Sequence, residues 1–208
     1  PVVLVEHQHP HRPPVEPWPV LGCGHDEAGL AGVGGGGHGH TLTRPAVLAG
    51  NLGRVPDTYA LYRSMSARPF GKRAFSLLFA NKAPSYRTVR PQVRDVRPHH
   101  AELTIRNRRA VRNHIGTLHA IAVCNGLEAA MGLLAEATTP PNRRWIPKGM
   151  TVSYLAKSTT DLLCIAETDP ADWAQLGDVP VRVRAVRTDG TVVVDGIITI
   201  YVSERPAS

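Results

Sequence analysis

The stretch "NHIGTLHAIAVCNGLEAAMGLLAEA", residues 113–137, decides the fold. It opens with polar residues and a glycine, and then becomes almost wholly apolar and small until Pro140 and Pro141. A helix that is apolar on most of its sides must be enclosed by other elements. The sequence therefore predicts one long central helix, and its alanines and glycines would let a surrounding sheet approach closely.

Helix and strand candidates lie on both sides of this stretch. Residues 56–65 and 72–84 favour two short helices that cover a sheet edge or a pocket mouth. The strand candidates are 87–96 (at an edge or a bend, because of Pro91), 101–111, 149–157, 161–168, 179–187 and 191–203. Asp189 and Gly190 mark a tight turn before the last of them. Strands and helices do not alternate, so a doubly wound parallel sheet is not expected. The order predicts an α+β fold in which a curved antiparallel sheet wraps around the central helix.

Charge and composition divide the chain near residue 50. The formal net charge of +7 splits into about −2 for residues 1–50, which hold two basic and four acidic residues, and about +9 for residues 51–208. Proline, glycine and histidine dominate the first part, and no apolar period is visible there. Such a composition cannot bury enough surface to form a core, and its histidines match no structural zinc spacing. We expect a disordered leader over 1–50 and one folded domain over 51–208.

Cysteine use and hydropathy point to a cytoplasmic protein. The three cysteines are odd in number and widely spaced, which argues against a disulfide framework and suits a reducing compartment. The longest apolar run, 120–135, contains Asn125 and Glu128 and falls short of the roughly 18 residues that a membrane span requires. No basic segment precedes an apolar one at the N-terminus, so a secretory signal is not expected.

One carboxylate interrupts the apolar helix. Residues 121, 124, 128, 131 and 135 share one helical stripe, which places Glu128 among Ile121, Cys124, Met131 and Ala135 rather than on a solvent face. A carboxylate buried without a partner is costly, so Glu128 requires either a structural partner or a chemical role. An apolar environment also suits a carboxylate to general-base work near neutral pH.

The start of the same helix is polar. Gly116 and Thr117 are typical of a turn into a helix, and Asn113, His114 and His119 cluster around its first turn. Free backbone N–H groups at a helix start can stabilise a developing oxyanion. A carboxylate, a polar cluster and potential oxyanion donors therefore occur within sixteen residues.

This constellation resembles a known family signature. Asn113, Gly116, His119 and Glu128 fit the pattern N-x-x-G-x-x-H-x8-[DE], which resembles the central-helix signature of hotdog-fold acyl-CoA thioesterases, especially the phenylacetate-pathway type. The strings "RRAVRNHIGTLHAIAVCNGLEAAMG" and "RWIPKGMTVSYLAKS" are similar to a branch of that superfamily classed as a domain of unknown function and regarded as thioesterases. The resemblance covers about residues 54–203 and implies a hotdog fold.

The resemblance also implies roles for individual residues. Glu128 would be the general base or nucleophile, the backbone N–H of Ala120 would polarise the thioester carbonyl, and His119 and Asn113 would position the substrate or a water. The substrate would contact Gly116, Ile121 and Cys124. An acyl-CoA would be the substrate, with coenzyme A as part of it and no separate cofactor or metal. Members are homodimers or homotetramers with sites at the interface between protomers.

One departure from the family pattern would restrict the size of the substrate. Active thioesterases follow the histidine with Gly-Gly, whereas Ala120 and Ile121 stand here. A backbone donor survives the change to alanine, but Ile121 would narrow the space beside it. The alternative to a thioesterase is therefore a non-catalytic hotdog dimer that either binds acyl-CoA or is purely structural. For His119 the alternative to a role in the site is that it caps the start of the helix.

Other function classes fit less well. Eight arginines lie between residues 87 and 112, which suits the phosphates of coenzyme A. Nucleic-acid binding would need aromatic side chains among these arginines, but only Tyr86 is near, so we expect no nucleic-acid partner. The spacing expected of a hotdog hydratase is absent from the sequence.

Overall fold

The structure is a computed structural model, and it describes residues 57–206. The expected leader at 1–50 lies outside the described residues. The helices are α1 (Thr58–Ser66), α2 (Gly71–Lys82) and α3 (Ala120–Thr138), with short 3-10 helices η1 (Pro84–Thr88), η2 (Arg109–Val111) and η3 (Pro170–Trp173). The strands are β1 (Gln92–Arg97), β2 (His100–Ile105), β3 (Arg143–Tyr154), β4 (Leu162–Glu167), β5 (Gly177–Arg187) and β6 (Val192–Glu204).

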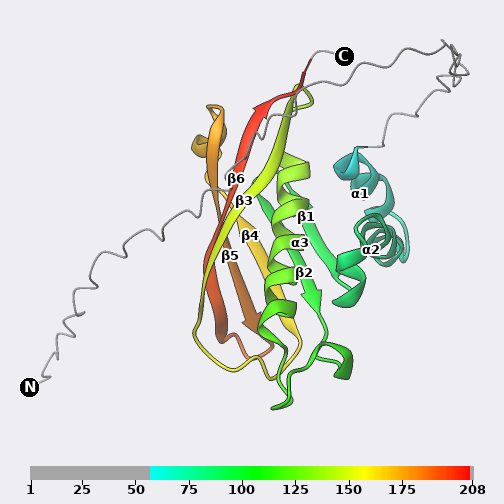
Figure 1. Ribbon diagram of the computed structural model, residues 1–208. Coiled ribbons are helices and arrows are strands. Elements are labelled where there is room, and N and C mark those ends of the chain that lie inside the picture. Colours follow the sequence, from blue (N-terminus) through cyan, green and yellow to red (C-terminus); the bar gives the residue numbers. More distant parts are fainter. Residues whose placement is uncertain (1–56, 207–208) are drawn as a thin grey trace, which may run out of the picture. The chain divides into compact units, whose positions relative to one another are not determined.

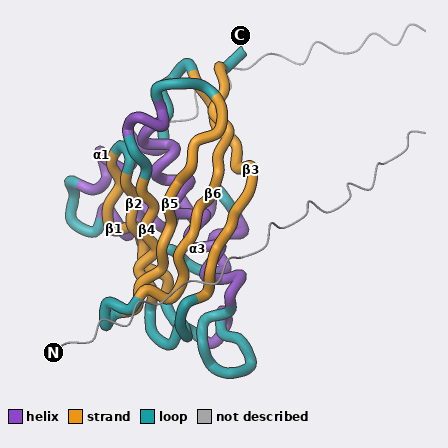
Figure 2. The backbone as a smooth tube through the Cα atoms, turned by 90° about the vertical axis from the view of Figure 1, so that its left-hand side faces the viewer, coloured by secondary structure: helices purple, strands orange, loops and turns teal. Residues whose placement is uncertain are grey.

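The six strands form one antiparallel sheet in the order β1-β2-β4-β5-β6-β3. Figure 1 shows α3 lying along this sheet, with α1 and α2 beside it, and Figure 2 shows the strands side by side with the helices behind them. The predicted tight turn joins β5 to β6, where Gly190 has φ +86°. The α+β architecture predicted from the sequence, one curved sheet around one long helix, is confirmed.

The inner face of α3 packs directly on the sheet. Val123, Leu127, Ala130 and Leu134 have at most 1% of their surface exposed. A Cβ added at Gly126 would lie 2.9 Å from the Cys164 sulfur of β4 and 3.1 Å from the side chain of Ile105 on β2. The missing side chain at Gly126 therefore sets how closely helix and sheet approach, as expected from the small residues of this stretch.

An aromatic row joins the N-terminal helices to α3. Tyr62 of α1 meets Phe75 of α2 edge to face at 5.2 Å between ring centroids, Phe75 stacks on Phe79 at 6.2 Å, and Phe79 stacks on Tyr86 of η1 at 5.2 Å. Tyr86 in turn lies beside α3, because its hydroxyl oxygen would be 3.8 Å from a Cβ added at Gly132. The predicted covering helices thus pack as one unit against the central helix.

The expectation that this stretch is too short to cross a membrane is wrong, because α3 continues to Thr138 and its 19 residues suffice by length and composition. In the fold, 56% of that stretch is buried inside the protein, which is the behaviour of a core helix. Glu128 and Asn125 remain on its less buried side.

Candidate active site at the start and open face of the central helix

His119 forms the N-cap of α3. Its backbone is extended (φ −64°, ψ 139°), and its Nδ1 accepts a hydrogen bond from the backbone N–H of Ile121 at 3.1 Å. The structure therefore confirms that His119 caps the helix, which was the alternative role predicted for it. Within residues 57–206, no group accepts a hydrogen bond from the backbone N–H of Ala120. The donor expected at this position is thus available at the first turn.

Asn113 and Gly116 build the loop that leads into this cap. The Asn113 side-chain oxygen accepts from the N–H groups of Ile115 (3.2 Å) and Thr117 (3.1 Å), and its amide nitrogen donates to the Thr117 hydroxyl at 2.8 Å. Gly116 has φ +82°, a conformation that favours glycine. The structure thus uses both residues to shape the turn, and their contact with a substrate stays a prediction.

The helical stripe that carries Glu128 runs from the surface into the core. Ile121 is 66% exposed, Cys124 and Glu128 are half-buried, and Met131 and Ala135 are fully buried. The stripe predicted from the sequence is therefore present, but Glu128 lies at its half-buried middle and not among fully buried side chains. Among the described residues, Glu128 takes part in no ion pair or hydrogen bond, and its carboxylate is left for a role outside the packing of the fold.

Tyr86 is the neighbour of Glu128 that sequence reasoning missed. Burial, and then the negative charge of Glu128, raise the pKa of Tyr86 to about 12. The phenol therefore stays protonated beside the carboxylate at neutral pH. Its only sequence signal is one aromatic residue next to a basic segment, which does not indicate contact with a helix more than forty residues away.

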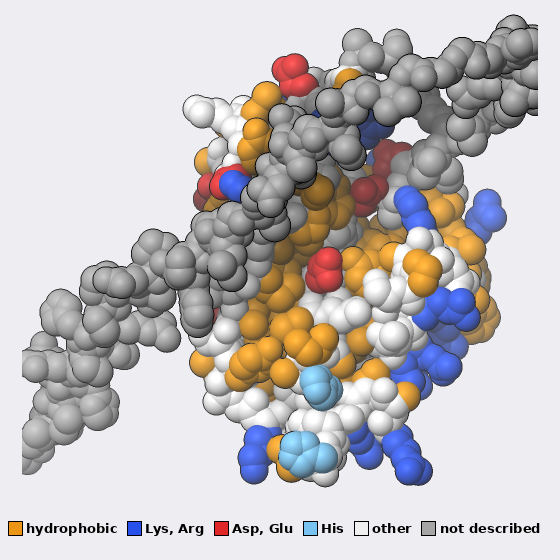
Figure 3. Space-filling model, viewed as in Figure 1, with side chains coloured by type: hydrophobic (Ala, Val, Ile, Leu, Met, Phe, Trp, Pro, Cys, Tyr) orange, Lys and Arg blue, Asp and Glu red, His pale blue; other side chains and the backbone are white. Residues whose placement is uncertain are grey.

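Strand β3 borders the same open face. The Cys124 sulfur and the Tyr154 hydroxyl are 3.3 Å apart, and this hydrogen bond, followed by burial, raises the pKa of Tyr154 to about 12. Met150 is 37% exposed and Tyr154 55% exposed, although both alternate with polar residues as in a half-buried strand. Figure 3 shows apolar side chains gathered over the face that α3 and β3 form. Cys124 is thus half-buried at the border of this face, and its contact with a substrate stays a prediction.

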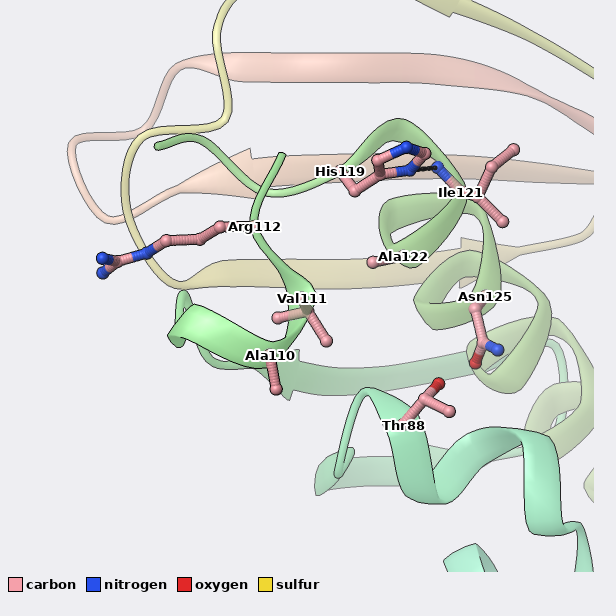
Figure 4. Close-up of a pocket in the computed structure, with 8 residues that line it drawn as sticks. All are labelled: Thr88, Ala110, Val111, Arg112, His119, Ile121, Ala122 and Asn125. Carbon is pink, nitrogen blue, oxygen red and sulfur yellow. Dashed lines mark hydrogen bonds between the residues drawn. The ribbon is translucent and has the colours of Figure 1, made fainter. Parts of the chain in front are cut away.

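A cavity of about 260 Å³ opens beside the first two turns of α3. Figure 4 shows its lining residues, with Thr88 and Asn125 pointing toward one another and the Arg112 side chain pointing away. Asn125 donates to the Ser85 carbonyl at 3.3 Å, while its buried side-chain oxygen has no hydrogen-bond partner in the part of the chain that the structure describes. The lining residues are Thr88, Ala110, Val111, Arg112, His119, Ile121, Ala122 and Asn125.

This cavity unites only part of the predicted site. It brings His119 and Ile121 together, but Glu128, Cys124 and Asn113 do not line it. Asn125 was noticed in the sequence as a polar break in the helix and not as a site residue. A larger hollow of about 740 Å³ lies at the opposite end of α3, around Glu136 and Trp145. We assign the site to the smaller cavity, because the uncapped N–H of Ala120 is at that end of the helix.

Arg108 contacts Thr88 of the cavity wall and lies near Arg90, and neither arginine forms an ion pair with a carboxylate in residues 57–206. Arg108 donates to the backbone carbonyl of Thr88, and its buried Nε has no hydrogen-bond partner among the described residues. Burial, and then the charge of Arg90, lower the pKa of Arg108. Two neighbouring guanidinium groups next to a cavity make a suitable environment for an anion. In residues 57–206, no three His, Cys, Asp or Glu side chains are grouped to hold a metal ion.

Comparison with known proteins identifies the family. Residues 71–202 match the family described as a domain of unknown function, DUF4442. The chain belongs to the DUF4442 family. The protein designated "genomics APC5556" is 39% identical in sequence, over 72% of this chain and 99% of that one, with a TM-score of 0.63. No protein of curated function matches the sequence.

More distant solved structures share the fold of this DUF4442 protein. A Pseudomonas aeruginosa protein, PA5026, described as a probable thioesterase of unknown function, is 20% identical over 62% of this chain and 92% of its own, with a TM-score of 0.56. The Haemophilus influenzae thioesterase HI1161 is 12% identical over 66% and 93%, also with a TM-score of 0.56. The hotdog fold implied by the sequence resemblance is therefore confirmed.

Proposed function

We propose that this protein hydrolyses the thioester bond of an acyl-CoA, with Glu128 as the general base. The observation that carries the proposal is a half-buried carboxylate with no partner in the described fold, on the helix whose first N–H group is also free. Thioesterases among the structures of the same fold support the reaction class. Coenzyme A enters as part of the substrate, and Arg90 and Arg108 are positioned to attract its phosphates.

The chemistry needs few groups. Glu128 removes a proton from a water as the water oxygen attacks the thioester carbonyl carbon. The carbonyl oxygen becomes an oxyanion that accepts a hydrogen bond from a backbone N–H at the helix start. When the intermediate collapses, the carbon–sulfur bond breaks and the thiolate leaves with the proton returned by Glu128. The products are a carboxylic acid and coenzyme A.

The helix geometry requires two chains for this reaction. Ala120 and Glu128 are eight residues apart, which is about 12 Å along a helix that rises about 1.5 Å per residue. An oxyanion donor must lie about 3 Å from the oxygen it stabilises, so one helix does not offer both groups to one carbonyl. We therefore propose a homodimer in which Glu128 of one protomer works with the Ala120 N–H of its partner. The open apolar face of α3 and β3 supports this assembly.

The first experiment measures free-thiol release from a panel of acyl-CoAs. Glu128→Gln should lower the rate at least about a hundredfold, since it removes a general base. Glu136→Gln is the matched control, because Glu136 is the other carboxylate of α3 and lies two turns further from the helix start. Equal rates for wild type and Glu128→Gln would refute the proposed base.

The second experiment tests whether the two groups come from different chains. Proline lacks an N–H and is tolerated at the first helical position, and the extended backbone of His119 suits the residue before a proline. Ala120→Pro and Glu128→Gln chains, each inactive alone, should recover roughly a quarter of wild-type activity when mixed as random dimers, since each heterodimer holds one intact site. No recovery would place both groups in one chain.

The non-catalytic alternative rests on Ile121, whose exposed side chain stands beside the free N–H where a glycine would leave room. Calorimetry separates the two functions. Acyl-CoA binding by the wild type without any thiol release would establish the binding role, whereas binding with turnover would exclude it.

A further inference from the structure

The outer face of α2 is apolar and exposed. Phe70, Leu77 and Leu78 are 76%, 65% and 51% exposed, and Ala74 lies between them. Positions 74, 77 and 78 fall on one face of α2, opposite Phe75 and Ser76, which pack inward, and Phe70 precedes the helix as its N-cap. Scattered apolar side chains are ordinary on a surface, but here three large ones follow one helix.

The backbone holds Phe70 at the head of this stripe. Phe70 precedes α2 with φ +60°, a left-handed conformation that is unusual for a bulky residue. The junction is tight, because a Cβ at Gly71 would lie 1.7 Å from the Met65 carbonyl oxygen. A backbone outlier of this kind is a reason to look for function. Its effect here is to project an aromatic ring into solvent at the start of the helix.

Charge around the stripe has a single sign. From Thr58 to Arg94 the chain contains no Asp or Glu, and all eight of its basic side chains are exposed. The Arg73 guanidinium lies 5.8 Å from the centroid of the Phe70 ring. Figure 3 shows blue basic side chains around orange apolar ones on the side where Figure 1 places α1 and α2. The eight are Arg63, Arg68, Lys72, Arg73, Lys82, Arg87, Arg90 and Arg94.

We infer that the α2 stripe (Phe70, Ala74, Leu77 and Leu78) with its surrounding cations is a docking surface for an anionic lipid bilayer. The stripe protrudes on a convex helix, so its side chains can enter the boundary between head groups and acyl chains. Arginine keeps its charged group in water while its stem lies along apolar surface, and basic residues near a bilayer are attracted to anionic lipids. Charge complementarity thus favours a lipid surface. This inference does not depend on the hydrolase function.

Co-sedimentation of the full chain with lipid vesicles tests the inference. We expect binding to vesicles of equimolar phosphatidylcholine and phosphatidylglycerol, weak binding to phosphatidylcholine alone, and weaker binding as salt is raised. Leu77→Ser with Leu78→Ser should weaken the affinity at least about tenfold, because the inserted apolar surface is lost. Arg68→Gln with Arg73→Gln should weaken it on the order of fivefold for each charge removed.

Leu155→Ser with Leu176→Ser is the matched control, since both leucines are exposed but lie outside α2. Its binding should equal that of the wild type, and all variants should keep the wild-type melting temperature. Equal binding to neutral vesicles, or unchanged binding after loss of Leu77 and Leu78, would overturn the inference. A different result would also overturn the lipid inference. If the protein bound no vesicle, and the variant lacking Leu77 and Leu78 had a smaller mass than the wild type by light scattering, the stripe would be a contact between two copies of the chain.

Discussion

At the scale of single residues, His119 shows how a structural contact fixes chemistry. Its Nδ1 accepts the Ile121 N–H, so a neutral ring carries its proton on Nε2. The exposed nitrogen then donates a hydrogen bond and does not accept a proton. In the proposed reaction His119 is therefore able to orient a carbonyl or a water, and the role of base is left to Glu128.

Two substitutions of His119 distinguish its role as helix cap, through Nδ1, from its proposed role as hydrogen-bond donor to the substrate, through Nε2. His119→Ala should lower the free energy of unfolding by about 1 kcal/mol, because alanine offers no cap acceptor. His119→Asn should restore much of that stability, since asparagine is a strong N-cap. If Nε2 contacts substrate, His119→Asn regains the melting temperature without regaining kcat. Recovery of both quantities would show that His119 acts only as a cap.

Sequence reasoning located part of the site because helical counting depends only on the chain itself. It placed Glu128 on one stripe with Ile121 and Cys124, and the structure keeps these three on one face. It did not show that this face is open, since burial depends on which elements cover the helix. Tyr86 and Thr88 were missed because they approach α3 from η1, and this contact exists only after folding.

At the scale of elements, the two glycines of α3 differ in how much space their surroundings leave for a side chain. A Cβ at Gly126 would press on Cys164 and Ile105, whereas a Cβ at Gly132 would meet Trp145 and Tyr86 at ordinary distances of 3.7 and 3.8 Å. Close packing in a core leaves little room for an added methyl group. Helix propensity alone favours alanine over glycine at both positions.

Alanine substitution should therefore change stability in opposite directions. We expect Gly126→Ala to lower the free energy of unfolding by about 1–2 kcal/mol, as strain exceeds the gain in helix propensity. Gly132→Ala should raise it by up to about 1 kcal/mol. Urea unfolding followed by circular dichroism measures both, and equal effects of the two substitutions would contradict this account of helix–sheet contact.

The strands were predictable in number and order but less so in extent. Alternation correctly placed Val181, Val183 and Ala185 on the buried face of β5. Strand β3 was expected from residue 149, yet it begins at Arg143 and passes through Pro147. Proline argues against a central strand but is tolerated at a sheet edge. The sequence pattern alone does not say which strand is at the edge.

At the scale of the whole molecule, three buried or bonded groups make stability sensitive to alkaline pH. Burial, and then the nearby Cys124, raise the pKa of Cys164 to about 12, and the pKa values of Tyr86 and Tyr154 are also raised to about 12. In the unfolded chain thiols lose protons near pH 8.5 and phenols near pH 10. Between these values and pH 12 the folded state binds more protons, so stability falls as pH rises.

The melting temperature should accordingly be level up to about pH 8 and decline from about pH 9 toward pH 12. Thermal melts across this range measure it. The decline should be shallower in Cys164→Ala, which removes one of the titrating groups. A level profile up to pH 11 would show that these groups do not hold their protons in the folded state.

Light scattering of the purified protein tests the proposed dimer. The mass should be twice that of one 22.5 kDa chain. Met150→Pro should lower it, because the N–H of Met150 points away from β6 and proline removes this donor from the free edge of β3. Glu136→Gln is the control and should keep the wild-type mass. A proline in a buried strand, such as Val183→Pro in β5, would unfold the protein and is unsuitable as a control. A monomeric wild type would exclude the proposed composite site.

The free edge of β3 has a consequence for handling the protein. Its first half is protected against further strand pairing by Arg143, Arg144, Pro147 and Lys148, with an irregular register beside Pro147. Its second half, residues 149–154, contains no charged side chain and no proline. A chain released from the proposed dimer would therefore expose an unprotected template for β-aggregation. Precipitation, rather than a lasting monomer, is the expected fate of such a chain.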